Sequence, residues 1–325
     1  MSMNATDTDD LAFGKDEVIT RKELKPFTRR TDRHGLMYFG VHMSALVSSG
    51  VLLFLAMGTW WVVPAMLLHA LVMVNIYTPV HDCSHGTVFR TRWVNETVYR
   101  FLSLIYIWTP LYYRYRHAMH HTYTQIRGRE RDPDIILSEP HWVRGYFYYA
   151  TTIPYWKRQF TWLGSHALGI REPADSYFIP DDEWPRIFRE ARYTWAVYAV
   201  VAVAAIYFSS WAPVIYWLLP RFIGEPFRRW NNLTEHCGLP EGPDLRVNTR
   251  TTLTWKWLEK VVWNMNYHAE HHISPQVPFH ALPTLHEKIG HLLHTDTGLI
   301  NVHLSAIKYY REIECQGGAV ARQKA

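Results

Sequence analysis

Residues 35–80 contain no Asp, Glu, Lys or Arg. The hydrocarbon core of a bilayer takes about 20 apolar residues of α-helix. The stretch is therefore long enough for two transmembrane helices, which we place at about 36–57 and about 60–80, with a turn near Gly58. Basic residues crowd the N-terminal segment 1–34, whereas the turn carries no charge, and this asymmetry indicates a cytoplasmic N-terminus.

A second uncharged stretch runs over residues 193–220 and is interrupted near Pro213. Two crossings here would keep the residues on either side of it on one face of the membrane, which the histidine pattern described below requires. We therefore expect two short or tilted spans, at about 188–208 and about 212–230. Arg221 lies within the second of them, and its long side chain is expected to reach the polar interface.

Residues 82–187 and 237–310 are charged and aromatic, and they are expected to lie outside the bilayer. Within them, Val98–Tyr113 is long enough for one interfacial helix. The predicted fold class is an all-α integral membrane protein with four transmembrane helices in two hairpins and a large cytoplasmic helical cap. Residues 35–310 are expected to form one domain, followed by a C-terminal tail at 311–325.

Eight of the 19 histidines fall into three short clusters. These are His81 and His85; His117, His120 and His121; and His268, His271 and His272. Residues three and four apart are neighbours on a helix, so the imidazoles of one cluster can point to one place. Neutral imidazole binds zinc, copper, iron and nickel. Eight ligands are too many for one ion, so the pattern favours a dinuclear site, with iron preferred for oxygen chemistry.

Five further residues accompany the histidine clusters. His236 follows Asn232 by four residues, so it is a ninth candidate ligand, and the Asn232 amide would lie near a metal or hold a metal-bound water. Asp82, Glu235 and Glu270 each adjoin a candidate ligand. Carboxylates so placed commonly accept the second imidazole N–H, although a merely solvated side chain is the alternative for each.

Other histidines do not fit the pattern. His42 and His69 lie within the first charge-free stretch and are expected to hydrogen-bond to neighbouring helices. His286 and His291 have a glutamate between them, as in zinc peptidases, but that motif needs its second histidine four residues after the first, and here it is five.

Composition agrees with a membrane protein. The chain is 48% hydrophobic and holds 15 Trp and 20 Tyr, the residues that favour the membrane–water interface. Its net charge of +5 suits anionic headgroups, and the sequence has no basic helix or stacking motif typical of nucleic-acid binding. The three cysteines form no Cys-x-x-Cys pair, which excludes disulfide scaffolds and iron–sulfur ligation.

The three clusters and their spacing resemble the histidine boxes of the membrane-bound fatty acid desaturase and hydroxylase superfamily, over most of residues 35–305. His81-Asp-Cys-Ser-His85 is similar to the first box, His117-Ala-Met-His120-His121 to the second, and His268-Ala-Glu-His271-His272 to the third. The pair Asn232 and His236 is similar to an intermediate element that supplies a further ligand. The string from Asn264 to His272 is similar to bacterial members, some of which work with Rieske-type ferredoxins.

The resemblance implies four transmembrane helices, a di-iron centre in the cytoplasmic cap, and O₂ as co-substrate for C–H oxidation. Because the chain lacks the haem signature His-Pro-Gly-Gly, electrons are expected from an external donor, a ferredoxin with its reductase. The expected location is a bacterial inner membrane with both termini and the active site cytoplasmic. The substrate is expected to be a fatty acyl chain or a related aliphatic compound, and membrane lipids are expected partners.

Three alternatives stay open. Within the same chemistry, hydroxylation of a lipid or small molecule competes with desaturation, since the geometry of the bound chain decides between them. A membrane zinc hydrolase would use fewer histidines and a catalytic carboxylate such as Glu270. A metal transporter would carry histidines at mid-membrane depth, as only His42 and His69 do.

Overall fold

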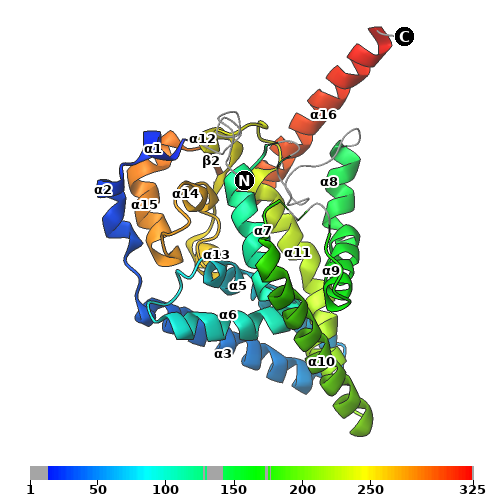
Figure 1. Cartoon of the computed structure of the whole chain (residues 1–325). Coiled ribbons are helices and arrows are strands. Elements are labelled where there is room, and N and C mark those ends of the chain that lie inside the picture. The colour runs from blue at the N-terminus through cyan, green and yellow to red at the C-terminus, as the bar shows by residue number, and fades with distance from the viewer. Residues whose placement is uncertain (1–13, 127–128, 130–141, 173–174, 176, 324–325) are drawn as a thin grey trace. The chain divides into compact units, whose positions relative to one another are not determined.

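The computed structural model describes residues 14–126, 129, 142–172, 175 and 177–323, and nearly all its regular structure is helical (Figure 1). The chain forms two compact units. Unit 1 comprises residues 1–29, 116–153 and 229–325, and unit 2 comprises residues 30–115 and 154–228. The helical character agrees with the predicted fold class.

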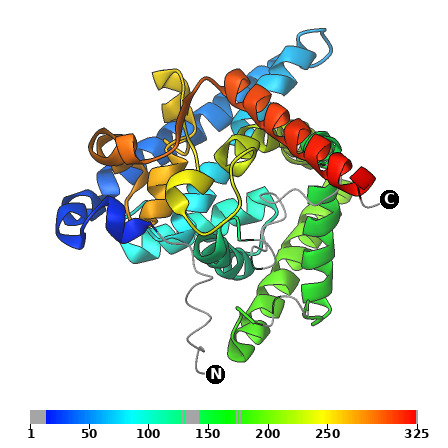
Figure 2. The same ribbon diagram turned by 90° about the horizontal axis from the view of Figure 1, so that it is seen from above.

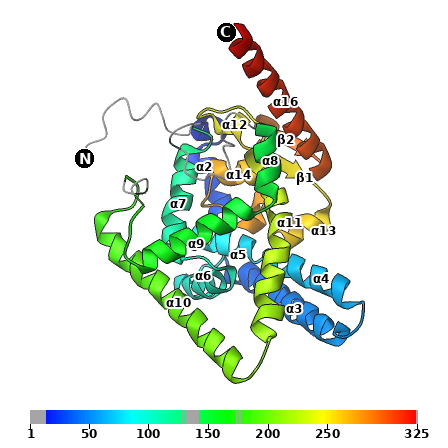
Figure 3. The same cartoon turned by 90° about the vertical axis from the view of Figure 1, so that its right-hand side faces the viewer.

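Unit 2 begins with a helical hairpin. Its elements are α3 (Asp32–Ala56), α4 (Val62–Val74), α5 (Tyr77–Ser84), α6 (Arg92–Tyr106), the first part of α7 (Pro110–Tyr123), most of α9 (Ile153–Ala167), η4 (Asp181–Glu183), α10 (Trp184–Tyr207), the π-helical turn η5 (Val214–Leu218) and the first part of α11 (Leu219–His236). Helices α3 and α4 form the hairpin (Figure 3), and Gly58 adopts the positive φ of 79° that its turn requires. The turn predicted near Gly58 is confirmed.

Two segments of the described chain, Asp32–Ala56 and Val62–Ser84, are long and apolar enough to cross a membrane. They match the first two predicted spans. Many of their apolar side chains are exposed, among them Val41 and Leu55, as lipid contact would require. The predicted interruption near Pro213 is also present, because α10 ends at Tyr207 and η5 begins at Val214. Crossing by the second hairpin stays a prediction.

The two histidines of the first hairpin join helices, as predicted. His42 Nε2 lies 3.1 Å from the carbonyl oxygen of Val72, which links α3 to α4. His69 Nδ1 lies 2.8 Å from Ser49 Oγ, and its Nε2 lies 3.0 Å from the carbonyl oxygen of Tyr216. Both imidazoles are therefore engaged in packing the helices of unit 2.

Arg221 does not reach an interface, so that prediction is wrong. Its side chain is fully buried and forms an ion pair with Glu225, and Arg228 Nε donates to the same carboxylate at 3.1 Å. The Arg221 guanidinium also lies 3.7 Å from the ring centroid of Tyr106 and donates to Tyr155 at 2.8 Å. The position of Arg221 in the sequence suggested contact with the polar membrane interface. In the structure its charge is instead accommodated by the Glu225 carboxylate and by the aromatic side chains of Tyr106 and Tyr155.

Replacing Glu225 with glutamine is expected to destabilise the protein strongly, because it leaves two buried guanidinium groups without their carboxylate. Breaking a buried ion pair from one side costs about 3–5 kcal/mol. The check is thermal or denaturant unfolding in detergent. Asp181→Asn breaks an exposed ion pair with Arg171 and serves as the control with little expected change. Equal midpoints for the two variants would contradict the prediction.

The single interfacial helix predicted over Val98–Tyr113 is wrong. Helix α6 ends at Tyr106, and Ile107 takes a left-handed conformation with φ 66° before α7 begins at Pro110. Pro110 lacks the backbone N–H that a continuous helix would need, so the chain breaks and restarts there. The restart sets the direction of α7, which carries the second histidine cluster.

His166 on α9 is buried against aromatic rings, with the Tyr112 ring centroid 4.5 Å away and Trp184 and Phe188 nearby. Burial lowers the pKa of His166 from 6.5 to about 4. The unfolded chain therefore binds this proton at a higher pH than the folded chain does. The stability that the neutral ring contributes is complete above pH 6.5 and is lost as the pH falls toward 4.

We expect His166→Phe to be less sensitive to acid than the unmodified protein, since a phenyl ring takes no proton. Unfolding midpoints measured across the pH range between the two pKa values test this. His291→Phe, at an exposed histidine, is the control and should retain the original slope. A slope unchanged by His166→Phe would count against the assignment.

Unit 1 holds short helices around the third histidine cluster. Its elements are α1 (Lys15–Val18), α2 (Arg21–Leu24), η2 (Lys25–Thr28), the last part of α7, α8 (Trp142–Ala150), the last part of α11, α12 (Leu245–Asn248), β1 (Thr251–Leu253), α13 (Lys256–Val261), α14 (His268–Ile273), η6 (Phe279–Ala281), α15 (Leu282–Ile289), η7 (Gly290–Leu292), β2 (Thr295–Thr297) and α16 (Leu299–Gln323). Strands β1 and β2 pair in parallel, with Thr251 opposite Thr295.

Two cores stabilise unit 1. The first surrounds α14 and joins it to α1, α2 and α15 through side chains such as Leu24, Ile273 and Leu285. The second joins α8, α11 and α16 through Tyr146, Leu233 and Ala306. Helices α8 and α16 pack side by side in this second core (Figure 2). Both α11 and α14, which carry candidate ligands, are therefore fixed by apolar packing.

Candidate metal centre

Parts of three helices bring seven candidate ligands together within unit 1. Helix α7 carries His117, His120 and His121; α11 ends at His236; and α14 carries His268, His271 and His272. The three- and four-residue spacings place the imidazoles of each helix on one face, as predicted. All seven side chains are buried.

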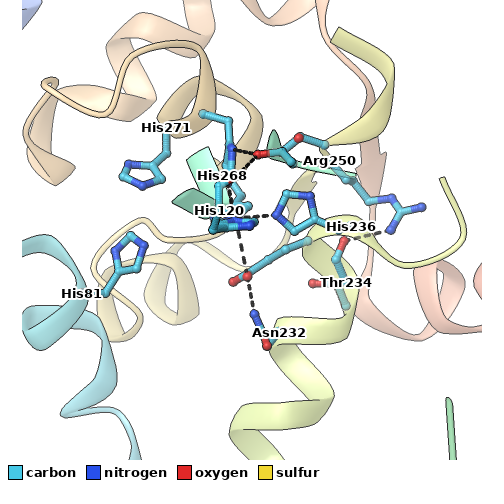
Figure 4. Close-up of polar contacts among 12 residues, drawn as sticks. His81, His120, Asn232, Thr234, His236, Arg250, His268 and His271 are labelled. Carbon is cyan, nitrogen blue, oxygen red and sulfur yellow. Dashed lines mark hydrogen bonds and ion pairs between the residues drawn. The ribbon is translucent and has the colours of Figure 1, made fainter. Parts of the chain in front are cut away.

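Four of these histidines form one compact group, called here the four-histidine group. It consists of His120, His236, His268 and His272, whose ligand atoms all lie within 4.8 Å of one another. His272 Nε2 lies 3.1 Å from both His120 Nε2 and His268 Nε2, and His268 Nε2 lies 3.0 Å from His236 Nε2. Figure 4 shows His120, His236 and His268 turned toward one another from three different helices.

His117, His121 and His271 form a second, three-histidine group. His121 Nε2 lies 3.1 Å from both His117 Nε2 and His271 Nε2. The two groups adjoin, since the His121 ring stacks on the His272 ring with centroids 4.2 Å apart. A dinuclear metal site needs two neighbouring groups of ring nitrogens of this kind.

The spacing of the ring nitrogens fits metal ions better than hydrogen bonds. Each ring nitrogen has one lone pair or one hydrogen in the ring plane, so it can make one such hydrogen bond. His272 Nε2 and His121 Nε2 each have two nitrogen neighbours at 3.1 Å. Nitrogens that bind one ion at about 2.1 Å and at right angles lie about 3.0 Å apart. The residues present therefore fit a bound cation in each group.

Burial keeps the His272 imidazole in the form that binds metal. The pKa of His272 lies well below its usual range, first because burial disfavours its charged form and then because His268, His120 and His236 surround it. A neutral ring offers a lone pair, whereas a protonated ring does not. A nitrogen lone pair of His272 is thus available at neutral pH.

Residues that the sequence analysis missed orient two of the rings. Thr124 Oγ1 donates to the carbonyl oxygen of His120 at 2.5 Å and so accepts from His272 Nδ1 at 3.1 Å. His236 Nδ1 lies 3.3 Å from the carbonyl oxygen of Asn248. These contacts place hydrogen on Nδ1 and leave Nε2 free to bind metal. The sequence could have indicated Thr124, because it lies four residues after His120, but no pattern in the sequence points to Asn248.

Asn232 and Glu235 lie beside the four-histidine group. Asn232 Nδ2 donates to Glu235 Oε2 at 2.5 Å, and that oxygen lies 3.5 Å from His268 Nε2 (Figure 4). Glu235 thus lies beside His268 Nε2, the nitrogen that faces the other histidines of the group, rather than beside Nδ1. Asn232 orients the carboxylate, and the carboxylate is the group nearer to the ring nitrogens.

Glu270 does not support a ligand imidazole in the way expected from its place in the sequence. Its fully buried carboxylate accepts from Thr251 Oγ1 and lies 2.6 Å from His286 Nδ1. The hydrogen bond to Glu270 raises the pKa of His286. Glu270 therefore joins α14 to β1 and α15. His286, which does not have the histidine spacing of a zinc peptidase, contributes to this packing through its contact with Glu270.

The first histidine cluster lies in unit 2, at the end of α5. The ring centroids of His81 and His85 are 5.1 Å apart, so both imidazoles lie on one side of the helix end. His81 Nδ1 lies 2.9 Å from Asp82 Oδ1. Asp82 thus has the predicted relation to a candidate ligand, because it holds one ring nitrogen and leaves Nε2 for a metal.

Comparison with known proteins places the chain in a family. The family model described as fatty acid desaturase matches residues 58–301, which include all three clusters and His236. The chain is 25% identical over 266 residues to the sn-1 oleoyl-lipid 12-desaturase of Picosynechococcus, covering 74% of this chain and 73% of that protein. It is 22% identical to the enzyme of the same name from Anabaena variabilis, covering 74% of each chain.

A plant protein is similar to a comparable degree. The chloroplastic omega-6 fatty acid desaturase of Arabidopsis thaliana is 23% identical over 265 residues, which cover 73% of this chain and 55% of the plant protein. The matched region of 58–301 exceeds half of the 325 residues, and its histidines form the buried nitrogen groups described above. The chain therefore belongs to the fatty acid desaturase family and is an oxidoreductase that desaturates fatty acyl chains.

Proposed function

We propose that the chain desaturates a lipid-linked fatty acyl chain with a di-iron centre held by nine histidines. The proposed ligands are His120, His236, His268 and His272 for one ion, and His117, His121 and His271, with His81 and His85, for the other. The observation that carries this proposal is the convergence of ring nitrogens at 3.0–3.1 Å in two adjoining buried groups. Bound iron would supply the electron transfer that reduces O₂ and allows hydrogen to be removed from carbon.

In the proposed reaction, two neighbouring carbons each lose one hydrogen and a double bond forms between them. One O₂ is reduced to two waters, which takes the two hydrogens from the substrate together with two electrons and two protons from outside. The two electrons must come from a separate donor, for which we propose a ferredoxin and its reductase. A Rieske-type ferredoxin is the finer form of this proposal.

The residues of the chain hold, orient and shield the centre. Thr124 and Asn248 fix two ring tautomers, and Asn232 orients Glu235 toward His268. The ligand side chains of unit 1 are at most 6% exposed, so bulk water has little access to them. A dry site suits an oxidant that would otherwise be quenched by solvent.

An acyl-lipid substrate has two supports. The relatives from Picosynechococcus and Anabaena are named oleoyl-lipid desaturases. Unit 2 also contains an open apolar pocket of about 830 Å³, lined by α10 and by side chains such as Trp217 and Phe222, which suits contact with a hydrocarbon chain. We further propose four membrane crossings in a bacterial inner membrane, with both termini and the iron site on the cytoplasmic face.

The alternatives have less support. A zinc hydrolase would need a free carboxylate, but Glu270 is buried and bound to Thr251 and His286. A transporter would use His42 and His69, which instead bond to neighbouring helices. Hydroxylation uses the same site, but the relatives compared above are named desaturases.

Lipid analysis of a host with and without the chain tests the proposal. We expect oxygen-dependent fatty acyl chains that have lost two hydrogen atoms, and their absence with the His120→Ala variant. Products that have gained one oxygen atom would establish hydroxylation instead. An iron-loaded protein, supplied with reductant and O₂, that changes no lipid would overturn the proposed function.

A further inference from the structure

Unit 1 exposes two tryptophans at the start of α13. Trp255 is 68% exposed and Trp257 is 63% exposed, and their rings lie nearly parallel, 8° apart, with centroids separated by 6.0 Å. Val261, at the end of the same short helix, is 46% exposed. Exposed apolar groups of this size mark a surface that contacts something other than water.

The segment that carries these tryptophans is rigidly attached to unit 1. Glu259 is buried and accepts hydrogen bonds from Lys256 at 3.0 Å and from the Tyr267 hydroxyl at 2.9 Å. The backbone N–H of Asn264 donates to the carbonyl oxygen of Glu259 at 2.7 Å. The exposed rings are therefore presented by an ordered element that ends next to α14.

Further exposed apolar side chains lie at the beginning of α16. Ile300 is 75% exposed and Leu304 is 61% exposed, and their spacing of four places them on one helix face. The backbone N–H of Gly298 donates to the carbonyl oxygen of Leu253 at 2.9 Å, which brings the start of α16 beside the strand that leads into Trp255. We call Trp255, Trp257, Val261, Ile300 and Leu304 the apolar edge.

The chemistry of the apolar edge fits a phospholipid interface. Tryptophan favours the boundary between headgroups and acyl chains, where its ring is apolar and its N–H stays hydrated. Lys256 and Lys260 are exposed in the same segment, where their positive charges can contact the anionic phosphates of lipid headgroups. A bilayer is also available to this chain, because α3 and Val62–Ser84 are suited to cross one.

We propose that the apolar edge docks unit 1 onto the phospholipid surface, with Trp255 and Trp257 inserted at the interface. This role goes beyond the proposed desaturation and does not depend on it. Because Glu259 and Tyr267 join α13 to α14, docking sets the depth of the helix that carries His268, His271 and His272 relative to the lipid.

Spin-label accessibility in lipid vesicles tests the proposal. The full chain with Cys315→Ser leaves only the buried Cys83 and Cys237, so Trp257→Cys provides one labelling site. The matched control is Glu17→Cys in the same background, at a side chain that is 58% exposed on α1 and outside the apolar edge. The proteins are reconstituted into vesicles of phosphatidylcholine and phosphatidylglycerol, and relaxation by O₂ is compared with relaxation by a water-soluble nickel complex.

We expect a ratio of O₂ to nickel accessibility several-fold higher at position 257 than at position 17, because O₂ concentrates in lipid. Nickel accessibility at 257 as high as at 17 would overturn the proposal, since the edge would then face water. A label shielded from both reagents would also overturn it, because a protein partner or a second copy would then cover the edge. Trp255→Cys repeats the measurement if Trp257→Cys does not fold.

Discussion

Replacing His272 with alanine is expected to abolish desaturase turnover and to remove iron from the four-histidine group at the same time. His272 Nε2 has two ligand nitrogens as neighbours at 3.1 Å, so its loss opens the centre of the group. Iron content measured on the purified protein and product formation measured on its lipids should therefore fall together. The same joint loss is expected for His120→Ala and His271→Ala.

The matched control for this prediction is His291→Ala, which removes an exposed imidazole outside both groups. It should retain iron and activity. Size-exclusion profiles separate loss of iron from loss of fold. If His272→Ala kept full activity with normal iron, the ligand assignment of the four-histidine group would be wrong.

Features encoded by local sequence were the ones that could be predicted. The first hairpin follows from a charge-free run long enough for two helices, and its turn follows from Gly58. The histidine clusters follow from three- and four-residue spacing, which needs only a helix to bring the side chains together. His236 was found because it repeats that spacing from Asn232.

Features that depend on contacts between distant segments could not be predicted. Arg221 has its aromatic partners Tyr106 and Tyr155 more than 60 residues away, so its burial is invisible in its own neighbourhood. Glu270 adjoins His271 in sequence, yet its carboxylate turns to Thr251 and His286. Adjacency in sequence shows which helix a carboxylate belongs to, but packing decides which way it faces.

The same distinction separates ligands from the groups that orient them. A ligand is recognisable by residue type and repeat, whereas an orienting group can be any donor or acceptor that packing brings to a ring nitrogen. Asn248 acts through its backbone carbonyl, which every residue possesses. Thr124 is different, because its side chain performs the task and can be tested by substitution.

Replacing Thr124 with valine is expected to weaken iron binding and activity by about 10–100-fold, the usual effect of removing a group that orients a metal ligand. Valine keeps the shape of the buried side chain but cannot accept a hydrogen bond from His272 Nδ1. The hydrogen of His272 can then move to Nε2 and block the ligand position. Competition with a chelator of known affinity measures the loss.

Helix α7 provides a matched control in Thr122. Its hydroxyl donates to the carbonyl oxygen of Ala118 at 2.8 Å, which is the same four-residue contact that Thr124 makes with His120. The two residues are of the same type, but Thr122 is exposed whereas Thr124 is buried. Thr122→Val therefore reproduces every local effect of the substitution on the helix without touching a ligand. Iron affinity should stay unchanged in this variant. Equal losses in the two variants would show that the helix, and not the imidazole of His272, responds to the missing hydroxyl.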